Sequence, residues 1–438
     1  MDLHAQRALS NFATLVDPKV GLIRSVKLVK LSETDPITYL AYTEPCDTTP
    51  IAGIAAANRG AACASTADRA ILRACGECIE RYCSAFFDLG SLRLASEQEL
   101  EGEGQQYLSV RTLYPFADAQ YARTDFPFEK VSSRRQLRWI AGCTTDGDPI
   151  WVPASCVFVP YRFDDSVEPF THMPISTGLA AGPSVQACIE KGICEIVERD
   201  ALMIIWYAKI PVPRIEVSSC YGISEEIDAL LQSVSAREPC TSWFLNVLTL
   251  DVSIPIISAA LIDEGSPPLT SFGVAAAVDP ARALQGALEE ALLTRLLVNR
   301  CPELRDDEIG AARNLRTLRD HMLVHAGSDL LRSRMNFLTS EGPLVAFHDV
   351  DWPNDQTRTV QERCRAAGLM VASVDITTSD VEDLGFKVVR SMLPGMQPLD
   401  NDHQHRYLGG ERLLSVPRKM GFAVASLKDL NPDPHPFP

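Results

Sequence analysis

Apolar residues recur along the chain at two different spacings, and this pattern predicts helices alternating with strands. Three segments carry apolar residues at every third or fourth position, as one face of a helix requires. These segments are Ser65–Tyr82, Val185–Trp206 and Asp279 to about Asn299. Ser65 followed by Asp68 predicts an N-terminal cap for the first helix. Asp279-Pro280 predicts the cap and the first turn of the third.

Shorter runs of apolar or alternating residues predict strands. These runs lie at 20–31, 137–143, 149–160, twice within 243–262, at 368–376 and at 387–392. More helix is expected within 309–337, whereas the proline-rich end, 431–438, can form neither a helix nor an inner strand. Strands and helices in alternation indicate a protein of mixed α and β structure. The length of 438 residues corresponds to roughly three domain-sized units. We expect subdomains at about 1–165, 166–300 and 301–438.

Composition and charge narrow the class of protein. Charged residues make up 22% and hydrophobic residues 46% of the chain, a globular balance that excludes wholesale disorder, collagen-like and coiled-coil structures. The formal net charge is −16 and Lys and Arg form no run, which argues against nucleic acid and membranes as partners.

The N-terminal segment and the cysteines bear on localisation. The first 19 residues contain no apolar signal segment, and no apolar stretch reaches the length of a membrane span. Thirteen scattered cysteines do not form the dense framework of a small secreted domain. We therefore expect a soluble, cytoplasmic protein with reduced thiols.

One short motif occurs twice, late in two of the predicted helices. Residues 77–81 and 195–199 both have the sequence Glu-x-x-Glu-Arg. At about 100° per residue, the two glutamates of each copy lie roughly 60° apart and off the apolar stripe. Two such helices side by side would bring four carboxylates together. Hard oxygen ligands of this kind suit Mg²⁺ that arrives with substrate phosphates.

Residues near each motif are suited to binding an anion. Arg81 and Arg199 can bind phosphate oxygens or orient the glutamates. Small-residue turns precede both helices, at 57–60 and 176–182, and their glycines allow backbone N–H groups to approach an anion. Arg295, on a predicted helix with Glu289 and Glu290, is a third candidate for contact with a triphosphate.

Each of these features also has a simpler explanation. Glu and Arg four residues apart are a common solvated pair on a helix, and Arg295 fits a surface cation. Cys75 and Cys78 could bind zinc, but no second Cys-x-x-Cys exists and the pair falls inside a predicted helix. We therefore favour a role for both cysteines as small buried residues.

The end of the chain fits a disordered tail or polyproline ligand, or a stiff segment that places its terminal carboxylate accurately. A P-loop, a dinucleotide-binding glycine motif and a Gly-x-Ser-x-Gly elbow are missing.

Taken together, these motifs resemble those of the YcaO family, in particular its azoline-forming cyclodehydratases. The resemblance extends over nearly the whole chain, and the stretch Ser176 to Asp200 is specific in combination with the proline-rich end. The other matching segments are Gly21-Leu22-Ile23, Phe272-Gly273, Ala283 to Arg295, Pro394-Gly395-Met396-Gln397-Pro398 and Leu408-Gly409-Gly410-Glu411-Arg412. The resemblance implies a single module of the α+β class with a fold of its own, in which mixed sheets and helices surround a central cleft for ATP and Mg²⁺.

The resemblance also implies roles for particular residues. The magnesium ligands would be Glu77, Glu80, Glu195 and Glu198. The ATP contacts would come from Arg59, Gly60, Arg81, Ser176, Gly178, Arg199 and Arg295. Pro434, Pro436 and the terminal carboxylate of Pro438 would form a catalytic tail, with the carboxylate as a base. In two places the sequence departs from the family: Arg59 replaces a frequent lysine, and Ala187 stands where a carboxylate that could ligate metal is common.

The reaction implied is ATP-dependent cyclodehydration of a ribosomal precursor peptide. A Cys, Ser or Thr side chain attacks the preceding amide carbonyl, the oxyanion takes the γ-phosphoryl group of ATP, and loss of phosphate leaves a thiazoline or oxazoline. Such enzymes mature thiazole- and oxazole-modified microcins and other bacteriocins. The implied partners are the precursor peptide, a separate ThiF-like leader-binding protein and a flavin-dependent azoline dehydrogenase, with a homodimer within the complex left open. The alternatives are thioamide or amidine formation, or a non-catalytic nucleotide- or peptide-binding scaffold.

Overall fold

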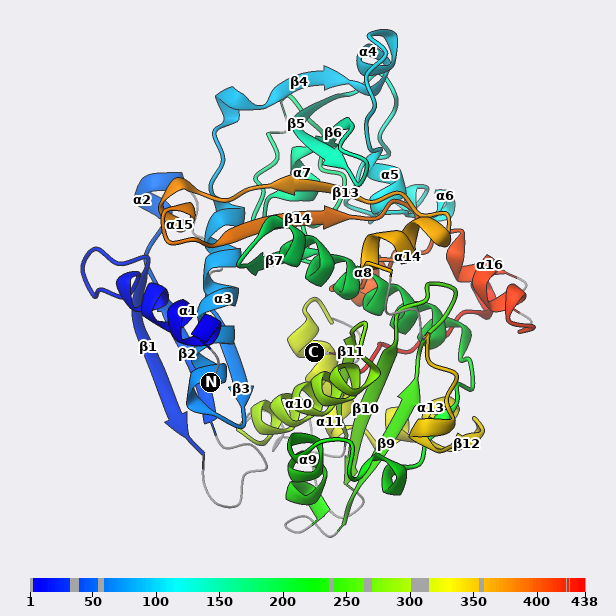
Figure 1. Ribbon diagram of the computed structural model, residues 1–438. Helices are drawn as coiled ribbons and strands as arrows, with labels where there is room; N and C mark the ends of the chain where they lie inside the picture. The colour runs from blue at the N-terminus through cyan, green and yellow to red at the C-terminus, as the bar shows by residue number, and fades with distance from the viewer. Residues whose placement is uncertain are drawn as a thin grey trace. The chain divides into compact units, whose positions relative to one another are not determined.

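The computed structural model describes residues 3–31, 39–53, 59–164, 166–235, 240–263, 270–300, 315–353, 358–422, 424 and 426–437. Contacts divide the chain into two interleaved units. Unit 1 comprises Met1–Lys30, Tyr39–Ile196 and Cys364–Met396; unit 2 comprises Leu31–Thr38, Val197–Arg363 and Gln397–Pro438. Both units combine helices and sheets (Figure 1), which confirms the α+β class. The expected subdomain boundaries near 165 and 300 do not coincide with these breaks, and the threefold division stays a prediction.

Unit 1 contains two antiparallel sheets. The smaller has the order β1 (Ile23–Lys30), β2 (Tyr39–Pro45), β3 (Ala61–Ala64). The larger has the order β4 (Arg93–Ser96), β5 (Gln136–Thr144), β13 (Ala372–Asp375), β14 (Lys387–Met392), β7 (Leu179–Gly182), with β6 (Pro149–Pro153) paired to β5. Segments far apart in sequence therefore meet where β7 pairs with β14. β7 is followed directly in the chain by helix α8 (Val185–Ala208), which supplies residues to both units.

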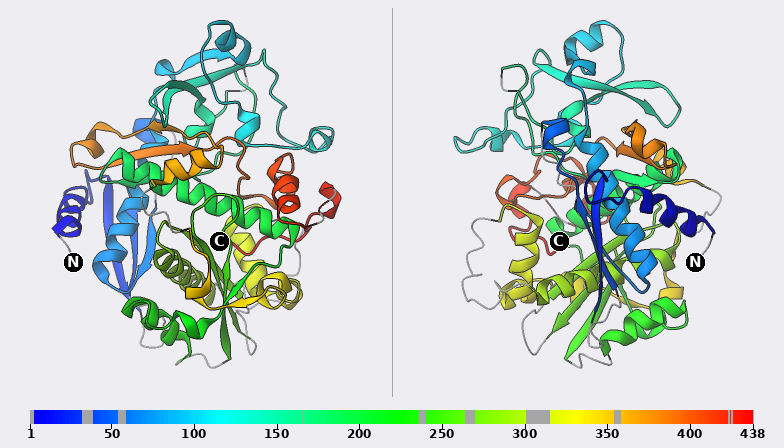
Figure 2. Two further views of the ribbon diagram at one scale, coloured as in Figure 1. Left: turned by 45° about the vertical axis from the view of Figure 1, so that its right-hand side comes forward. Right: turned by 90° about the vertical axis from the view of Figure 1, so that its left-hand side faces the viewer.

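Helix α3 (Ala67–Ala85) lies in the core of unit 1. Its residues Ala70 and Ala74 pack against the small residues of β2 and β3, where the blue strands and the helix lie together in both views of Figure 2. Its residues Cys75, Cys78 and Ile79 belong to a larger apolar cluster with side chains of β6, β13 and β14. Burial of these apolar side chains fixes the rotation of α3 about its axis. The polar edge that carries Glu77 and Glu80 is fixed with it.

Unit 2 is built on one five-stranded sheet. Its order is β11 (Thr270–Ala276), β10 (Ile256–Asp263), β9 (Thr241–Val247), β8 (Arg214–Ile215), β12 (Leu344–Val345), and only β8 and β12 are parallel among these strands. Helix α10 (Pro280–Asn299) packs on β10 and β11. Gly273 permits this packing, because a Cβ there would lie 2.4 Å from the backbone nitrogen of Ala291. Helices α9 (Glu225–Ser235) and α11 (Leu318–Gly327) contact α10.

The other α-helices in the described ranges have between 4 and 12 residues. They are α1 (Leu3–Thr14), α2 (Thr49–Ala52), α4 (Glu97–Gly102), α5 (Val110–Leu113), α6 (Asp118–Tyr121), α7 (Ala154–Val157), α12 (Asp329–Ser333), α13 (Asn336–Thr339), α14 (Val360–Ala366), α15 (Ser379–Glu382) and α16 (Arg412–Lys419). None of the helices in the described ranges is long and apolar enough to cross a membrane.

Most of the predicted elements are confirmed, and three differ in detail. The cap of α3 is Thr66 rather than Ser65, because Thr66 is extended and its hydroxyl accepts from the Arg69 N–H. The strand expected at 149–160 ends at Pro153, where α7 begins. The helix expected within 309–337 is three short helices, because Ser328 ends α11 and caps α12. Residues 301–314 lie outside the described residues.

Candidate nucleotide and metal site

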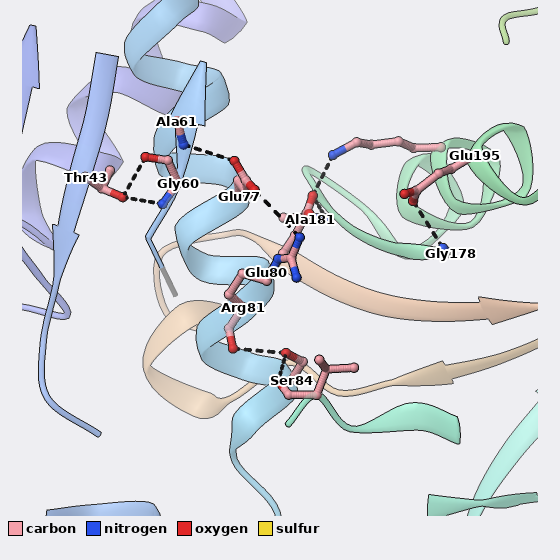
Figure 3. Close-up of polar contacts among 12 residues, drawn as sticks. Thr43, Gly60, Ala61, Glu77, Glu80, Arg81, Ser84, Gly178, Ala181 and Glu195 are labelled. Carbon is pink, nitrogen blue, oxygen red and sulfur yellow. Dashed lines mark hydrogen bonds and ion pairs between the residues drawn. The ribbon is translucent and has the colours of Figure 1, made fainter. Parts of the chain in front are cut away.

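Glu77 and Glu80 are held by backbone N–H groups in unit 1 (Figure 3). Glu77 Oε2 accepts from the Ala61 N–H at 3.0 Å, and Glu77 Oε1 lies 3.7 Å from the Arg81 guanidinium. Desolvation raises the pKa of Glu77, although the Ala61 N–H and Arg81 oppose it. Glu80 is 8% exposed, and its Oε1 accepts from the Ala181 N–H at 2.8 Å. These carboxylates are therefore not a solvated helix face.

Glu195 is tied to the turn that precedes its own helix. Its Oε2 accepts from the Gly178 N–H at 3.1 Å (Figure 3). Gly178 has φ of +87°, and a Cβ there would lie 2.4 Å from the Ser391 carbonyl oxygen. Gly192 of α8 faces the same turn, since its Cβ would lie 2.6 Å from the Gly178 carbonyl oxygen. The sequence 176–178 thus forms the predicted close turn, and Ser176 is half-buried in it.

The motifs in the sequence did not identify Lys191, whose side chain lies between the carboxylates of Glu80 and Glu195. Its Nζ is 2.5 Å from Glu80 Oε1, which joins α8 to α3 within unit 1. Desolvation of the ammonium is outweighed by Glu80 and Glu195, so the pKa of Lys191 is raised. Its position four residues before Glu195 and four after Ala187, on one edge of α8, was the available signal.

Glu198 and Arg199 belong to unit 2. Glu198 Oε2 accepts from the Ala276 N–H at 2.9 Å, and Glu198 Oε1 lies 3.0 Å from Arg199 Nη1. The centre of the Arg199 guanidinium is 3.7 Å from the centroid of the Phe437 ring. Arg295 is 4% exposed and pairs with Asp263 at 3.0 Å, so its interpretation as a surface cation is wrong.

The small-residue turn before α3 is only partly described. A Cβ on Gly60 would lie 1.9 Å from the Ala74 carbonyl oxygen, so this glycine allows β3 to approach α3. The Gly60 N–H donates to Thr43 Oγ1 at 2.8 Å (Figure 3), whereas Arg59 is exposed. Residues 57 and 58 lie outside the described residues. The ATP contacts at Arg59 and Gly60 stay predictions.

Cys75 and Cys78 are buried in the core, as favoured. Both are 0% exposed, and desolvation raises the pKa of each thiol to about 12. Within the described ranges no three His, Cys, Asp or Glu side chains are grouped closely enough to hold a metal ion. Zinc is not supported at this pair.

The proline-rich end is packed into unit 2. Asn431 and residues 433–437 are buried, so the alternative of a disordered tail is wrong for these positions. His325 Nε2 donates to the Pro434 carbonyl at 2.7 Å, and Phe437 is 1% exposed. Pro438 and its carboxylate lie outside the described residues, so their role as a base stays a prediction.

The donor set suits magnesium and phosphate. Glu77, Glu80 and Glu195 supply hard carboxylate oxygens in unit 1, and Glu198 supplies another in unit 2. Mg²⁺ needs only one or two carboxylates when nucleotide phosphates complete its coordination. That these four glutamates share one site stays a prediction.

Comparison with known proteins identifies the family. Residues 61–397 match the family described as YcaO cyclodehydratase, ATP- and Mg²⁺-binding. An uncharacterized protein of Methanothermobacter thermautotrophicus is 27% identical over 281 residues, which are 61% of this chain and 68% of that protein.

Two solved structures share the fold. A heterocyclase in complex with substrate and cofactor has a TM-score of 0.79 at 21% identity; the match covers 99% of this chain and 57% of that one, so this chain spans little more than half its length. YcaO from Methanopyrus kandleri, bound with AMPPCP and Mg²⁺, has a TM-score of 0.64 at 20% identity over 90% of this chain and 91% of that one. Because the family match over residues 61–397 covers more than half of its length, the chain belongs to the YcaO cyclodehydratase family.

Proposed function

We propose that this protein is an ATP- and Mg²⁺-dependent cyclodehydratase that converts Cys, Ser or Thr residues of a ribosomal precursor peptide to thiazolines or oxazolines. The observation that carries the proposal is the way in which the glutamates of the two Glu-x-x-Glu-Arg motifs are held. Both copies are held by backbone N–H groups and partly buried, whereas solvated ion pairs would leave the glutamates in water. Keeping carboxylates in such positions costs desolvation, which a bound cation repays.

The proposed chemistry is a phosphoryl transfer. The peptide side chain attacks the preceding amide carbonyl, and the resulting oxyanion attacks the γ-phosphoryl group of ATP, releasing ADP. Attack closes the ring with loss of the side-chain S–H or O–H proton. Loss of the amide N–H proton and of inorganic phosphate then forms the C=N bond of the azoline, so that the peptide is 18 Da lighter per ring. Mg²⁺ would neutralise the charge that develops on the phosphates.

The chain's own residues would bind and orient. The glutamates would hold the cation, and Arg199 and Arg295 would contact phosphate oxygens. We further propose a ThiF-like leader-binding protein as the partner that delivers the precursor, and a flavin-dependent dehydrogenase that oxidises the azoline.

A specific observation favours one alternative, a nucleotide- or peptide-binding scaffold without turnover. The ammonium of Lys191 already forms an ion pair with the Glu80 carboxylate, and Ala187 has no carboxylate to offer a metal ion. Both features would weaken a metal site.

The test combines purified protein, candidate precursor, ThiF-like protein, ATP and Mg²⁺. Phosphate release and a matching 18 Da loss per ring are expected for wild type. Both are expected to be lost in Glu195→Gln and retained in Glu190→Gln, a control on the same helix whose carboxylate accepts from Gln186 instead. Nucleotide binding without turnover would favour the scaffold. An external sulfide requirement would favour thioamide formation.

A further inference from the structure

Three consecutive backbone carbonyls of the buried tail, at residues 433–435, accept hydrogen bonds from side chains. Prolines lack an N–H and prevent the segment from joining a helix or sheet, so its carbonyls need partners from elsewhere. Trp206 Nε1 donates to the Asp433 carbonyl at 3.0 Å, and His325 Nε2 donates to the Pro434 carbonyl at 2.7 Å. His321 Nδ1 donates to the His435 carbonyl at 3.2 Å.

These donors also fix the protonation of the histidines. A carbonyl can only accept, so His321 carries its proton on Nδ1 and His325 on Nε2. The opposite nitrogens, His321 Nε2 and His325 Nδ1, are buried and have no hydrogen-bond partner among the described residues. His435 follows the same pattern, since its Nε2 donates to the Asp400 carbonyl at 2.8 Å and its Nδ1 has no such partner. The three rings are neutral donors in defined orientations.

Ring packing and one ion pair complete the contacts. The rings of His321 and His435 stack with centroids 4.0 Å apart, and His325 meets Trp206 edge to face at 5.5 Å. Arg334 Nη1 lies 2.6 Å from the Asp433 carboxylate. We call Trp206, His321, His325 and Arg334 the tail socket.

The tail held by this socket contacts Arg199 of the candidate site through Phe437. Phe437 is 1% exposed, and the centroid of its ring lies 3.7 Å from the centre of the Arg199 guanidinium. A planar guanidinium stacks favourably on an aromatic face, and a side chain held in advance loses less entropy when it binds phosphate.

We propose that the tail socket residues are positioning residues, which keep Phe437 against Arg199 and thereby orient that guanidinium toward the nucleotide. The nucleotide role of Arg199 rests on the proposed function. The seating of the tail does not, so the two can be tested separately.

The experiment compares variants of one socket histidine. His325→Leu removes the donor, whereas His325→Gln keeps an N–H that can reach the Pro434 carbonyl. His348→Leu, at a 74% exposed histidine, is the matched control. Carboxypeptidase digestion followed by intact mass measures tail release, calorimetry measures ATP affinity, and phosphate release with peptide and partner measures turnover.

We expect His325→Leu to release the tail about tenfold faster, and to bind ATP and turn over about tenfold less well, as loss of a buried hydrogen bond predicts. His325→Gln and His348→Leu should stay close to wild type. Deleting residues 434–438 should abolish the effect of His325→Leu on ATP affinity, because its partner is gone. Independent, multiplicative losses would mean that His325 acts apart from the tail and would overturn the proposal.

A second variant covers the case in which His325→Leu does not fold. Phe437→Leu leaves the socket intact and should weaken ATP binding about fivefold, with rescue by Phe437→Tyr. Unchanged affinity in Phe437→Leu would refute the role of Phe437 in orienting Arg199. Unchanged tail release in a folded His325→Leu would refute the socket alone, whereas absence of ATP binding by wild type would refute the proposed function.

Discussion

His325 should make the stability of unit 2 depend on pH in a measurable way. Its ring is 1% exposed and donates from Nε2, and burial lowers its pKa from 6.5 to about 4. The pKa of its neighbour His321 is lowered to about 3 by burial, and that of His403 to about 4. Asp433 favours protonation of His325 but does not outweigh burial.

The sign follows from the direction of the shift. Below pH 6.5 the unfolded chain binds a proton at His325, whereas the folded chain does not. The contribution of the neutral ring to the free energy of unfolding is therefore complete above pH 6.5 and is lost as pH falls towards 4. Between pH 7 and pH 5 the loss from this one ring is about 2 kcal/mol. His325→Gln keeps a donor but cannot titrate, so wild type should lose about 2 kcal/mol more than the variant over this range.

Comparison of the two proteins isolates His325 from other titrating groups. Burial raises the pKa of Asp400 to about 6, for example, and its contribution of opposite sign is common to both proteins. Urea unfolding at pH 7 and pH 5 measures the difference in free energy of unfolding. Selective histidine NMR, with the variant to identify the signal, should show that His325 stays neutral at pH 5. Equal pH dependence in both proteins, or titration of this ring near 6.5, would refute the neutral buried ring.

Three further predictions concern the close approach at Gly178 and the ion pairs of Arg412 and Lys191. Gly178→Ala should lower the melting temperature and weaken ATP binding, because its Cβ would meet a backbone oxygen at 2.4 Å; Gly147→Ala, at a positive φ with open space around it, separates backbone strain from this clash. Arg412→Met should destabilise the protein by about 3–5 kcal/mol in urea unfolding, because Asp200 is 1% exposed and would keep a buried charge without its bidentate partner; a change below about 1 kcal/mol would contradict this. Lys191→Met should tighten Mg²⁺ binding measured without nucleotide, because it removes the cation that occupies Glu80, whereas Lys191→Arg should resemble wild type; weaker binding in Lys191→Met would count against it.

Local sequence was sufficient where one element satisfies its own requirements. Asp279-Pro280 starts α10 as expected, because the Asp279 carboxylate caps the Ala281 N–H within the same turn. The apolar stripe of α8 and the alternation of β1 likewise predicted their elements. The cap of α3 was placed one residue early, because Ser65 and Thr66 are both capable caps and the backbone conformation decides between them.

The sequence alone determined that two helices carry Glu-x-x-Glu-Arg on a polar edge, and that the end of the chain can be neither a helix nor an inner strand. Only the tertiary structure decided what those residues contact. Lys191 meets Glu80, and Phe437 meets Arg199, across separations of 111 and 238 residues. Periodicity records which face an element buries, but not which distant side chain lies opposite. Those pairings depend on the register of strands such as β7 and β14 and on close approaches at Gly60 and Gly178, which the sum of many long-range contacts sets.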